Sequence, residues 1–441
     1  MPKIAIIGAG GFVFPLTIFR DVVAFPELRE STVSLMDIAP ERLERTAAGA
    51  RALAQEFDLP TVIESTTDRR ESLDGADFVV VCWQVGGLEA YRTDVEIPRE
   101  YGVDQPVGDT MGPGGIFRGL RTIEALKGFC ADARGLCPDA LVLNYANPMA
   151  INTWATYELG VEVVGLCHSV QGTSALLAAE AGVPAAECNY RAAGLNHQAW
   201  FVQFEHRGRD LLPVIRRRIY EKHVTGEAAG ERSDDLYAGG NEAVRGLIMQ
   251  LTGYFHSESS HHGSEYVPWF RKDAERVAEY LPRRWDYYDI CCNHDEEGQN
   301  ERFLAESRQR GLKPGQEYGA YIIHSLTTGQ PRVIHGSVRN EGIISNLPEG
   351  CAVEVPCLVD ANGVQPTVIG DLPPACAAVN RACVSVQELA VKAGLTGDRD
   401  LARAAVAMDP LTGAVCTLEE VREMVDRLFE AQAEWLPSFA R

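Results

Sequence analysis

Short, almost uninterrupted apolar runs recur through the first 170 residues and constrain the fold more than any other feature of the chain. The runs occupy residues 3–10, 33–37, 77–83, 141–148 and 161–168. Strands of a parallel sheet are buried on both faces, so they are continuously apolar rather than alternating. Between two of these runs, apolar residues recur at helical spacing over 116–131, which predicts a helix that covers the sheet. The alternation of strands and helices predicts an α/β fold with a doubly wound parallel sheet.

A change of pattern near residue 190 divides the chain into two predicted domains. Downstream of it, helix-like and strand-like segments are mixed, and an amphipathic segment over 418–436 predicts a terminal helix. A chain of 441 residues is also longer than one usual domain. We therefore expect a Rossmann-type domain in 1–190 and an α+β domain in 191–441 that carries substrate, metal and oligomerisation surfaces.

The charge balance and the cysteines exclude several kinds of partner. The chain has 41 Lys and Arg residues against 62 Asp and Glu residues, a net charge of −21. Binding to nucleic acid or to anionic lipid needs the opposite surplus, and no run approaches the ~18 apolar residues of a membrane span. The 12 cysteines are spread over a long chain, which is typical of a reducing compartment. We therefore expect a cytoplasmic protein that binds neither nucleic acid nor a membrane.

A glycine-rich turn follows the first apolar run and has the pattern of a dinucleotide-binding loop. Gly8 and Gly10 stand directly after the strand, although Val13 replaces the third glycine of the usual fingerprint. Asp37 ends the second run, where a carboxylate binds ribose hydroxyls and repels a 2′-phosphate, which favours NAD over NADP. The alternative is a glycine turn of another α/β protein with an ordinary Asp at a strand end. We expect NAD to contact Gly8, Gly10, Gly11, Phe12, Asp37, Gln84 and Asn147.

Polar residues also stand at the carboxyl ends of three other apolar runs. Gln84 comes just after residues 77–83, Asn147 comes after LVLNY in 141–148, and Cys167 comes after VEVVGL in 161–168. Ligands of open α/β sheets bind outside the carboxyl ends of the strands, so these side chains are candidates for contact with a ligand. Asn147 precedes a proline and could simply form a turn, but its amide could also bind a sugar hydroxyl or the nicotinamide.

Cys167 and His197 form a candidate metal site. Cys167 could be core filler, a disulfide partner, a nucleophile or a ligand, and the reducing compartment disfavours the disulfide. His197 lies among apolar residues, where a histidine is most often a paired core residue. Together with a thiolate, however, its imidazole can bind a divalent ion. Two protein ligands leave positions open for substrate, as in a catalytic rather than a structural site.

Two polar segments are candidate substrate loops. Residues 256–272 concentrate titratable groups beside aromatic ones: His256, His261, His262, Glu265, Tyr266, Arg271 and Lys272. Residues 108–122 form a Gly/Pro-rich loop that opens a helix and offers Asp109, Arg118 and Arg121 to a polar substrate. The alternative for this loop is a flexible connection whose arginines pair locally.

Motifs along most of the chain resemble glycoside hydrolase family 4, and within it the melibiase-type α-galactosidases. The motifs are IAIIGAGGFVF, LMDIAPERLERT, GDTMGPGGIFRGLRT, NYANPMAINTWA, GLCHSVQGT, GLNHQAWF, SEYVPWF and VRNEGIISNLPEGCAVEVPCLVDANGVQPT. The resemblance implies a lactate/malate dehydrogenase-like fold, NAD and Mn²⁺ as cofactors, and a homodimer or homotetramer. It also implies a mechanism different from that of most glycosidases, which use a pair of carboxylic acids.

The resemblance also implies roles for individual residues. Cys167 and His197 match the metal ligands, Tyr266 matches the catalytic base, and Asn147 matches a contact to substrate or nicotinamide. His168 stands where 6-phosphoglycosidases of the family carry an acidic residue, and we assign it to protonation of the leaving group. Substrate contacts are expected from Asn147, Asp109, Arg118 and His262.

The implied reaction is hydrolysis without net redox change. NAD⁺ takes a hydride from carbon 3 of the sugar, the base removes the proton on carbon 2, the aglycone leaves, water adds and the hydride returns. We expect an α-galactoside substrate, with an α-galacturonide or an α-glucoside as alternatives. An NAD-dependent hydroxyacid dehydrogenase and a non-catalytic NAD-binding sensor are alternatives of other classes.

Overall fold

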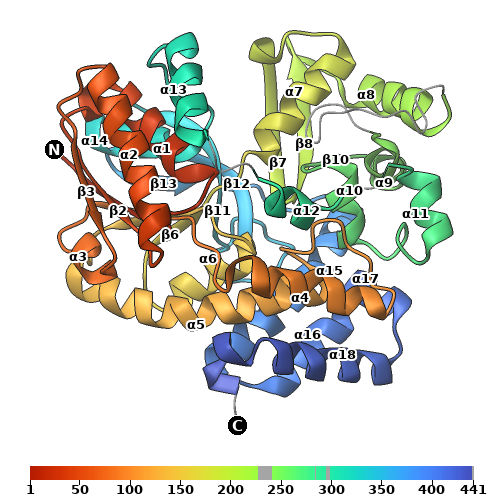
Figure 1. The fold of residues 1–441 in the computed structure, drawn as a ribbon. Coiled ribbons are helices and arrows are strands. Elements are labelled where there is room, and N and C mark those ends of the chain that lie inside the picture. Colours follow the sequence, from red (N-terminus) through yellow and green to blue (C-terminus); the bar gives the residue numbers. More distant parts are fainter. Residues whose placement is uncertain (227–240, 284, 295–297, 440–441) are drawn as a thin grey trace.

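The apolar runs fold as the parallel half of one mixed sheet (Figure 1). The computed structural model describes residues 1–226, 241–283, 285–294 and 298–439. The parallel strands lie in the order β3-β2-β1-β4-β5-β6. Their bounds are β1 (Lys3–Ile7), β2 (Thr32–Met36), β3 (Val62–Thr66), β4 (Phe78–Val81), β5 (Leu141–Asn144) and β6 (Val163–Gly165). All of them except β3 were predicted, and β3 was missed because it is a partly polar edge strand with solvent-accessible residues.

The second half of the sheet is antiparallel and is continuous with the first. β11 (Arg332–Arg339) pairs with β6, and the order continues through β12 (Ala352–Asp360), β7 (Cys188–Leu195), β8 (Gln198–His206) and β10 (Phe255–His256). Short strands β9 (Arg209–Asp210) and β13 (Gly363–Pro366) pair with β8 and β12. The predicted fold class, a Rossmann-type parallel sheet followed by an α+β part, is confirmed.

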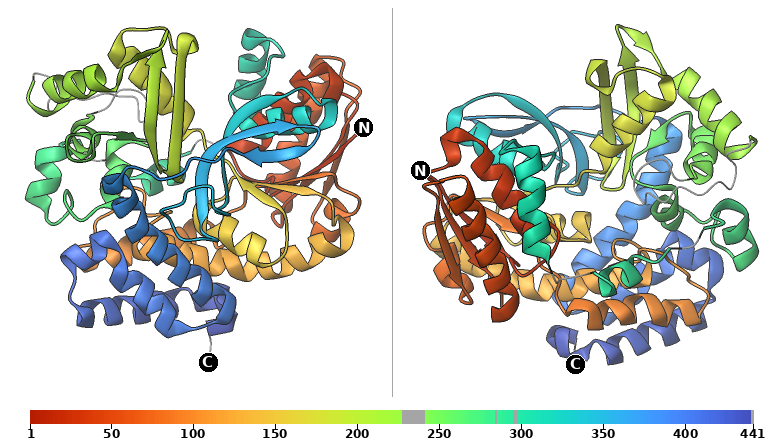
Figure 2. Two further views of the ribbon diagram at one scale, coloured as in Figure 1. Left: turned by 180° about the vertical axis from the view of Figure 1, so that it is seen from behind. Right: turned by 45° about the horizontal axis from the view of Figure 1, so that its top comes forward.

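Helices pack against the sheet and against one another (Figure 2). Their bounds are α1 (Phe14–Ala24), α2 (Pro40–Glu56), α3 (Arg69–Leu73), α4 (Gly87–Glu100), α5 (Gly112–Leu136), α6 (Met149–Glu158), α7 (Ser169–Ala181), α8 (Leu212–Ile219), α9 (Ala243–Thr252), α10 (Ser260–Gly263), α11 (Ala274–Tyr280), α12 (Tyr287–Cys292), α13 (Gln299–Arg310), α14 (Tyr318–Thr328), α15 (Pro374–Thr396), α16 (Arg399–Met408), α17 (Pro410–Val415) and α18 (Leu418–Ala431). The helix predicted over 116–131 lies within α5, and the predicted terminal helix is α18. Within the described ranges, no helix has the length and apolar character that crossing a membrane requires.

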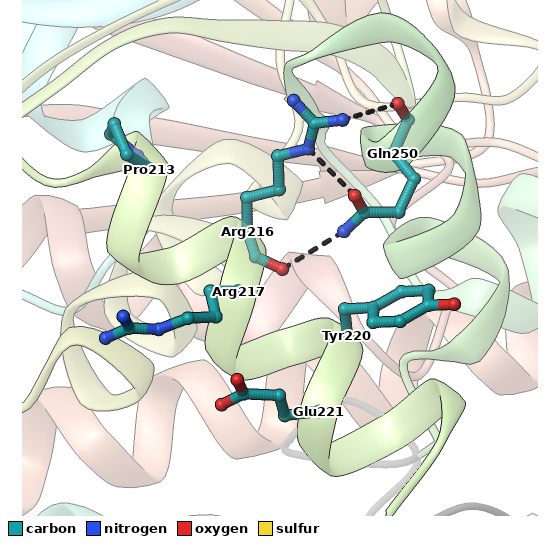
Figure 3. A pocket seen from close by; sticks show the side chains of 6 residues that line it. All are labelled: Pro213, Arg216, Arg217, Tyr220, Glu221 and Gln250. Carbon is teal, nitrogen blue, oxygen red and sulfur yellow. Dashed lines mark hydrogen bonds between the residues drawn. The ribbon is translucent and has the colours of Figure 1, made fainter.

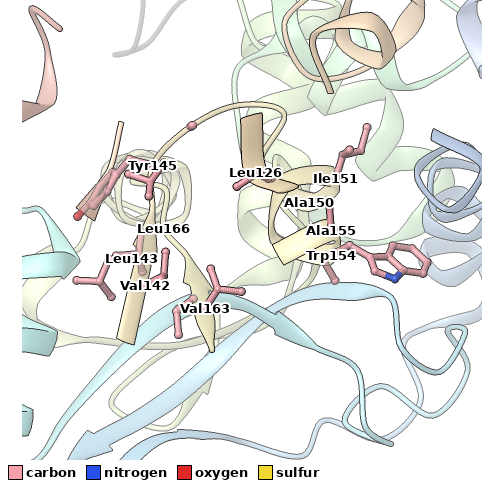
Figure 4. Packing of buried hydrophobic residues seen from close by; sticks show 14 of the residues in the cluster. Leu126, Val142, Leu143, Tyr145, Ala150, Ile151, Trp154, Ala155, Val163 and Leu166 are labelled. Carbon is pink, nitrogen blue, oxygen red and sulfur yellow. The ribbon is translucent and has the colours of Figure 1, made fainter. Parts of the chain in front are cut away.

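Buried apolar side chains between the sheet and α6 hold the ends of two strands in place (Figure 4). Val142 and Leu143 of β5 and Val163 of β6 belong to one core cluster with Ile151 and Trp154 of α6. Burying each such side chain stabilises the fold by roughly 1.5–3 kcal/mol. The loops that follow these strands therefore start from a rigid base.

A buried ion pair ties α5 to α4. Arg121 of α5 donates to both carboxylate oxygens of Asp94 in α4, at 2.8 and 2.6 Å, and neither side chain is exposed. Gln432, just after α18, accepts from Arg121 and donates to Asp94. The remaining Nε of Arg121 donates to the carbonyl of Val85. The expectation that Arg121 reaches a polar substrate is therefore wrong, because its donors are used inside the protein.

Replacing Arg121 should destabilise the fold strongly. We expect Arg121→Met to lower the free energy of unfolding by about 3–5 kcal/mol, because the Asp94 carboxylate stays buried without its cation. Chemical denaturation of the variant and the wild type measures the difference. Arg92→Met is the matched control on α4, since the Arg92–Glu96 pair is exposed and should be worth about 0–1 kcal/mol. Equal losses in the two variants would contradict this role of Arg121.

Candidate functional site

The predicted site residues lie along one edge of the parallel sheet. Gly8 follows β1 and Asp37 follows β2, while Gln84, Asn147 and Cys167 follow β4, β5 and β6. These strands are direct neighbours in the sheet, so their carboxyl ends form a continuous edge. The sequence correctly predicted that each of these residues stands at the carboxyl end of a strand, because the apolar runs become strands.

The glycine turn after β1 has the geometry of a dinucleotide loop. Gly8 has a φ of +90°, and a Cβ at this position would lie 2.6 Å from the backbone nitrogen of Trp83. The N–H of Gly10 donates to Oδ2 of Asp37 at 2.8 Å, which joins the turn to the end of β2. α1 begins at Phe14 without a side-chain cap or an acidic residue in its first turn. The start of α1 therefore lacks the negative side chains that would compete with a pyrophosphate for its N–H groups.

A later segment of the chain packs against this turn. The ring of Phe12 stacks on His294, with ring centroids 3.9 Å apart, and its carbonyl accepts a hydrogen bond from Gln299 at 3.0 Å. Gln84 instead donates to the carbonyl of Gly87 at 3.0 Å. The helices α12 and α13 thus flank the predicted cofactor loop, which the sequence alone did not indicate.

Cys167 and His197 meet, and a third side chain joins them. Nε2 of His197 lies 3.4 Å from Sγ of Cys167 and 3.6 Å from Oε2 of Glu258. The three donor atoms all lie within 4.8 Å of one another. His197 belongs to the two-residue turn between β7 and β8, and both His197 (φ 63°) and Glu258 (φ 76°) have left-handed backbone. Such strain concentrates at functional sites.

The three side chains fit a divalent cation. Burial raises the pKa of Glu258, but the positive charge that His197 and His262 carry when they are protonated outweighs burial and holds this pKa below its usual value. Thiolate, imidazole and carboxylate together are a common ligand set for divalent transition metals. Sequence reasoning missed Glu258, although it lies within the polar segment 256–272 that is a candidate substrate loop.

Tyr266 and His262 lie on the other side of the His197 ring. Nδ1 of His197 is 3.3 Å from the hydroxyl of Tyr266 and 2.9 Å from Nε2 of His262. Nδ1 of His262 is in turn 3.2 Å from Oε2 of Glu265. Both ring nitrogens of His262 are thus engaged within the protein, which leaves neither of them for a sugar hydroxyl.

Asp109, Arg118 and Asn147 form the polar wall next to this cluster. The amide of Asn147 donates to Asp109 at 3.0 Å, and Nε of Arg118 donates to the carbonyl of Asn147 at 3.2 Å. Burial raises the pKa of Asp109, but Arg118 and the ring of His262 outweigh it and hold this pKa below its usual value. Nη1 of Arg118 is buried and has no hydrogen-bond partner among the described residues.

His168 lies beside Cys167 at the start of α7, and its side chain lies near the carboxylate of Glu317. Its side chain is 48% exposed, and its Nδ1 lies 3.8 Å from Oε1 of Glu317. The side chain of His168 is therefore accessible from solvent. Glu317 was not among the predicted site residues.

Three further polar residues of 256–272, His256, His261 and Arg271, are held by other parts of the protein. Nε2 of His261 pairs with the carbonyl of Arg283 at 2.8 Å. Arg271 is buried and donates to the backbone carbonyl of Asp104. Burial lowers the pKa of His256, which lies in β10, to about 3. These side chains hold the segment in place.

A hollow of 270 Å³ is lined by residues other than those of the site (Figure 3). Its walls come from α8, from the π-helical turn Tyr220–Val224 and from α9; its lining residues are Pro213, Arg216, Arg217, Tyr220, Glu221 and Gln250. Arg216 is already bound to the side chain and the carbonyl of Gln250, as the dashed lines in Figure 3 show. No predicted site residue lines this hollow.

Two models of known protein families match this chain. The family model described as family 4 glycosyl hydrolase matches residues 3–183, and the model of the family 4 glycosyl hydrolase C-terminal domain matches residues 192–412. The chain belongs to family 4 of the glycosyl hydrolases. The resemblance predicted from the sequence motifs is thereby confirmed, and the chain is a glycoside hydrolase.

Relatives and a solved structure match the family 4 chain over nearly its whole length. An α-galactosidase from Rhizobium meliloti (strain 1021) is 39% identical, over 99% of this chain and 90% of the relative. An α-galactosidase from Bacillus subtilis (strain 168) is 34% identical over the full length of both. The structure of a 6-phospho-α-glucosidase from gut microorganisms, in complex with NAD and Mn²⁺, has a TM-score of 0.79 at 22% identity and covers 99% of each chain. This last likeness shows a shared fold.

Neutralising Glu258 should weaken metal binding. We expect Glu258→Gln to lower the affinity for Mn²⁺ at least about tenfold, because the variant loses one charged ligand of the three. Electron paramagnetic resonance of free Mn²⁺ during a titration measures the affinity. Glu279→Gln, which removes an exposed charge from α11, controls for nonspecific attraction by the acidic chain. A Glu258→Gln variant that binds Mn²⁺ as the wild type does would exclude Glu258 as a ligand.

Proposed function

We propose that this family 4 glycosyl hydrolase cleaves α-galactosides with NAD⁺ and Mn²⁺, through transient oxidation of the sugar at carbon 3. The observation that carries the proposal is the cluster of Cys167, His197 and Glu258 beside Tyr266, on the sheet edge that also bears the glycine turn. The full-length similarity to two α-galactosidases supports the choice of galactose. The solved relative with NAD and Mn²⁺ supports the cofactors.

The residues present fit both cofactors. The uncapped start of α1 and the carboxylate of Asp37 would hold the pyrophosphate and a ribose, and Cys167, His197 and Glu258 would hold the cation. When bound, NAD⁺ would supply a hydride acceptor at carbon 3 and Mn²⁺ would supply Lewis acidity at the neighbouring oxygens.

Tyr266 is the proposed base for the proton on carbon 2. Burial raises the pKa of Tyr266 well above its usual range, and nearby negative groups, among them Asp109 and Glu265, raise it further. The hydroxyl can therefore lose its proton near neutral pH only when positive charge is placed beside it. A cation held by Cys167, His197 and Glu258 would supply this charge, because the hydroxyl of Tyr266 lies next to His197.

The other side chains orient the substrate and complete the elimination. Asp109 and Asn147 present a hydrogen-bonded pair that can receive sugar hydroxyls or the nicotinamide amide. His168 can donate a proton to the leaving oxygen because its ring is accessible beside the proposed cation site.

Tyr266→Phe should remove proton abstraction. We expect exchange of the carbon-2 proton of the substrate with deuterated solvent to slow by at least about a hundredfold, since general-base catalysis contributes about 10²–10⁴. Mass spectrometry or NMR of recovered substrate measures the exchange, and NAD affinity should stay near that of the wild type. Exchange at the wild-type rate would exclude Tyr266 from this role.

An α-galacturonide is the second candidate substrate, and Arg118 favours it. Nη1 of Arg118 is a buried guanidinium nitrogen with no partner among the described residues, and such a group can bind a carboxylate. Arg121 and Arg271, which the sequence offered equally, are engaged within the protein.

A panel of p-nitrophenyl glycosides decides between these substrates. The α-galactoside, α-galacturonide and α-glucoside share one leaving group, so their rates with NAD⁺, Mn²⁺ and a reductant report the sugar preference alone. We expect the galactoside to be cleaved fastest and NADH not to accumulate. Faster cleavage of the galacturonide would replace the proposed substrate, whereas stoichiometric NADH without nitrophenol would indicate a dehydrogenase.

We also propose that residues 1–190 form a Rossmann-type NAD-binding domain and residues 191–441 an α+β domain, that both contribute side chains to the site, and that the protein is a cytoplasmic homodimer or homotetramer. All 12 cysteines are free, which supports a reducing compartment. Light scattering of the purified protein tests the assembly.

A further inference from the structure

We propose that His262 is a positioning residue, which fixes the proton of His197 on Nδ1 and leaves Nε2 of His197 as the acceptor that faces a divalent cation. The proposal rests on the metal site of the proposed function and deepens it. It gives His262 a role other than the substrate contact expected from the sequence.

Glu265 decides which atom donates in the hydrogen bonds that link Glu265, His262 and His197. This side chain is fully buried, and its oxygens accept from the backbone N–H groups of Val107 (2.7 Å) and Gly108 (3.1 Å) and from the amide of Gln105 (3.0 Å). A carboxylate surrounded by such donors acts only as an acceptor. The contact of 3.2 Å between Oε2 of Glu265 and Nδ1 of His262 therefore requires the proton on Nδ1 of His262.

The proton on Nδ1 of His262 in turn decides which nitrogen of His197 carries a proton. In its neutral form an imidazole has one donor and one acceptor nitrogen, so Nε2 of neutral His262 accepts. Nδ1 of His197, 2.9 Å away, must then donate. The lone pair of His197 is thereby left on Nε2, which lies beside Cys167 and Glu258.

Tyr266 cannot set the direction in the same way. Its hydroxyl lies 3.3 Å from Nδ1 of His197, but a hydroxyl can donate or accept and rotates to suit its partner. His262 has no such freedom, because Glu265 holds it and the residue is only 2% exposed. Partners of this kind fix the tautomer of a metal-binding histidine.

Two substitutions at His262 test the proposal by metal binding rather than by turnover. We expect His262→Leu to weaken Mn²⁺ binding about 10- to 100-fold, as measured by electron paramagnetic resonance, while NAD binding measured by calorimetry stays near wild type. His262→Gln should recover most of the loss, because its amide can accept from His197 and donate to Glu265. Mn²⁺ binding of wild-type strength in His262→Leu would overturn the proposal.

Glu265→Gln tests the direction of the chain of hydrogen bonds. Its amide can donate to His262, which places a proton on Nε2 of His262 and, through it, on the metal-facing nitrogen of His197. We expect Mn²⁺ affinity to fall as in His262→Leu. Asp409→Asn is the matched control, since Asp409 is also buried and accepts the N–H groups of Gly112 and Thr412 without belonging to this chain of hydrogen bonds. Equal Mn²⁺ affinities in wild type and Glu265→Gln would overturn the proposal.

The tautomer can also be observed in the wild type, so that the test does not depend on how the variants fold. Nitrogen-15 NMR of the metal-free protein should show a protonated Nδ1 and an unprotonated Nε2 for His197, whose signals are identified by their loss in His197→Gln. The opposite pattern would overturn the proposal. A wild type that shows this pattern but binds no Mn²⁺ would instead overturn the metal site of the proposed function.

Discussion

The contact between Cys167 and His197 is the constraint on which the site depends. Cys167 follows β6 in the parallel half of the sheet, and His197 lies in the turn between β7 and β8 in the antiparallel half. In the sheet, β11 and β12 lie between β6 and β7, so the contact of 3.4 Å is made across two intervening strands. The site therefore exists only while both halves keep their register.

This arrangement buries carboxyl groups near Cys167 and His197, and their surroundings shift the pKa values of these groups differently. Glu354 of β12 is buried, and burial, together with the nearby Cys167, raises the pKa of its carboxyl group well above the usual range. The pKa of Glu258 is lowered instead, by the charge that the histidines beside it carry when they are protonated. The pKa values of neighbouring carboxyl groups are thus shifted in opposite directions by their partners, and the group with the lowered pKa is the one that lies with Cys167 and His197.

Much of the fold and of the cofactor loop could be predicted, because their signals are local. An apolar run becomes a strand with its carboxyl end at the ligand edge, so Gly8, Asp37 and Cys167 could be placed before any contact was known. The arginines show the limit of this reasoning. Arg118 and Arg121 are both on α5, yet only Arg118 keeps a guanidinium nitrogen without a partner among the described residues, since Arg121 meets Asp94 from another helix.

The sequence by itself determined the parallel sheet, the dinucleotide loop and the membership of the family, since these depend on residue order within short segments. Only the tertiary structure decided that Glu258 lies with Cys167 and His197 and that the ring nitrogens of His262 contact His197 and Glu265. The physical reason is that a ligand set and a hydrogen-bond direction depend on distances between segments far apart in the chain. Packing of the two sheet halves sets those distances, and no local pattern encodes them.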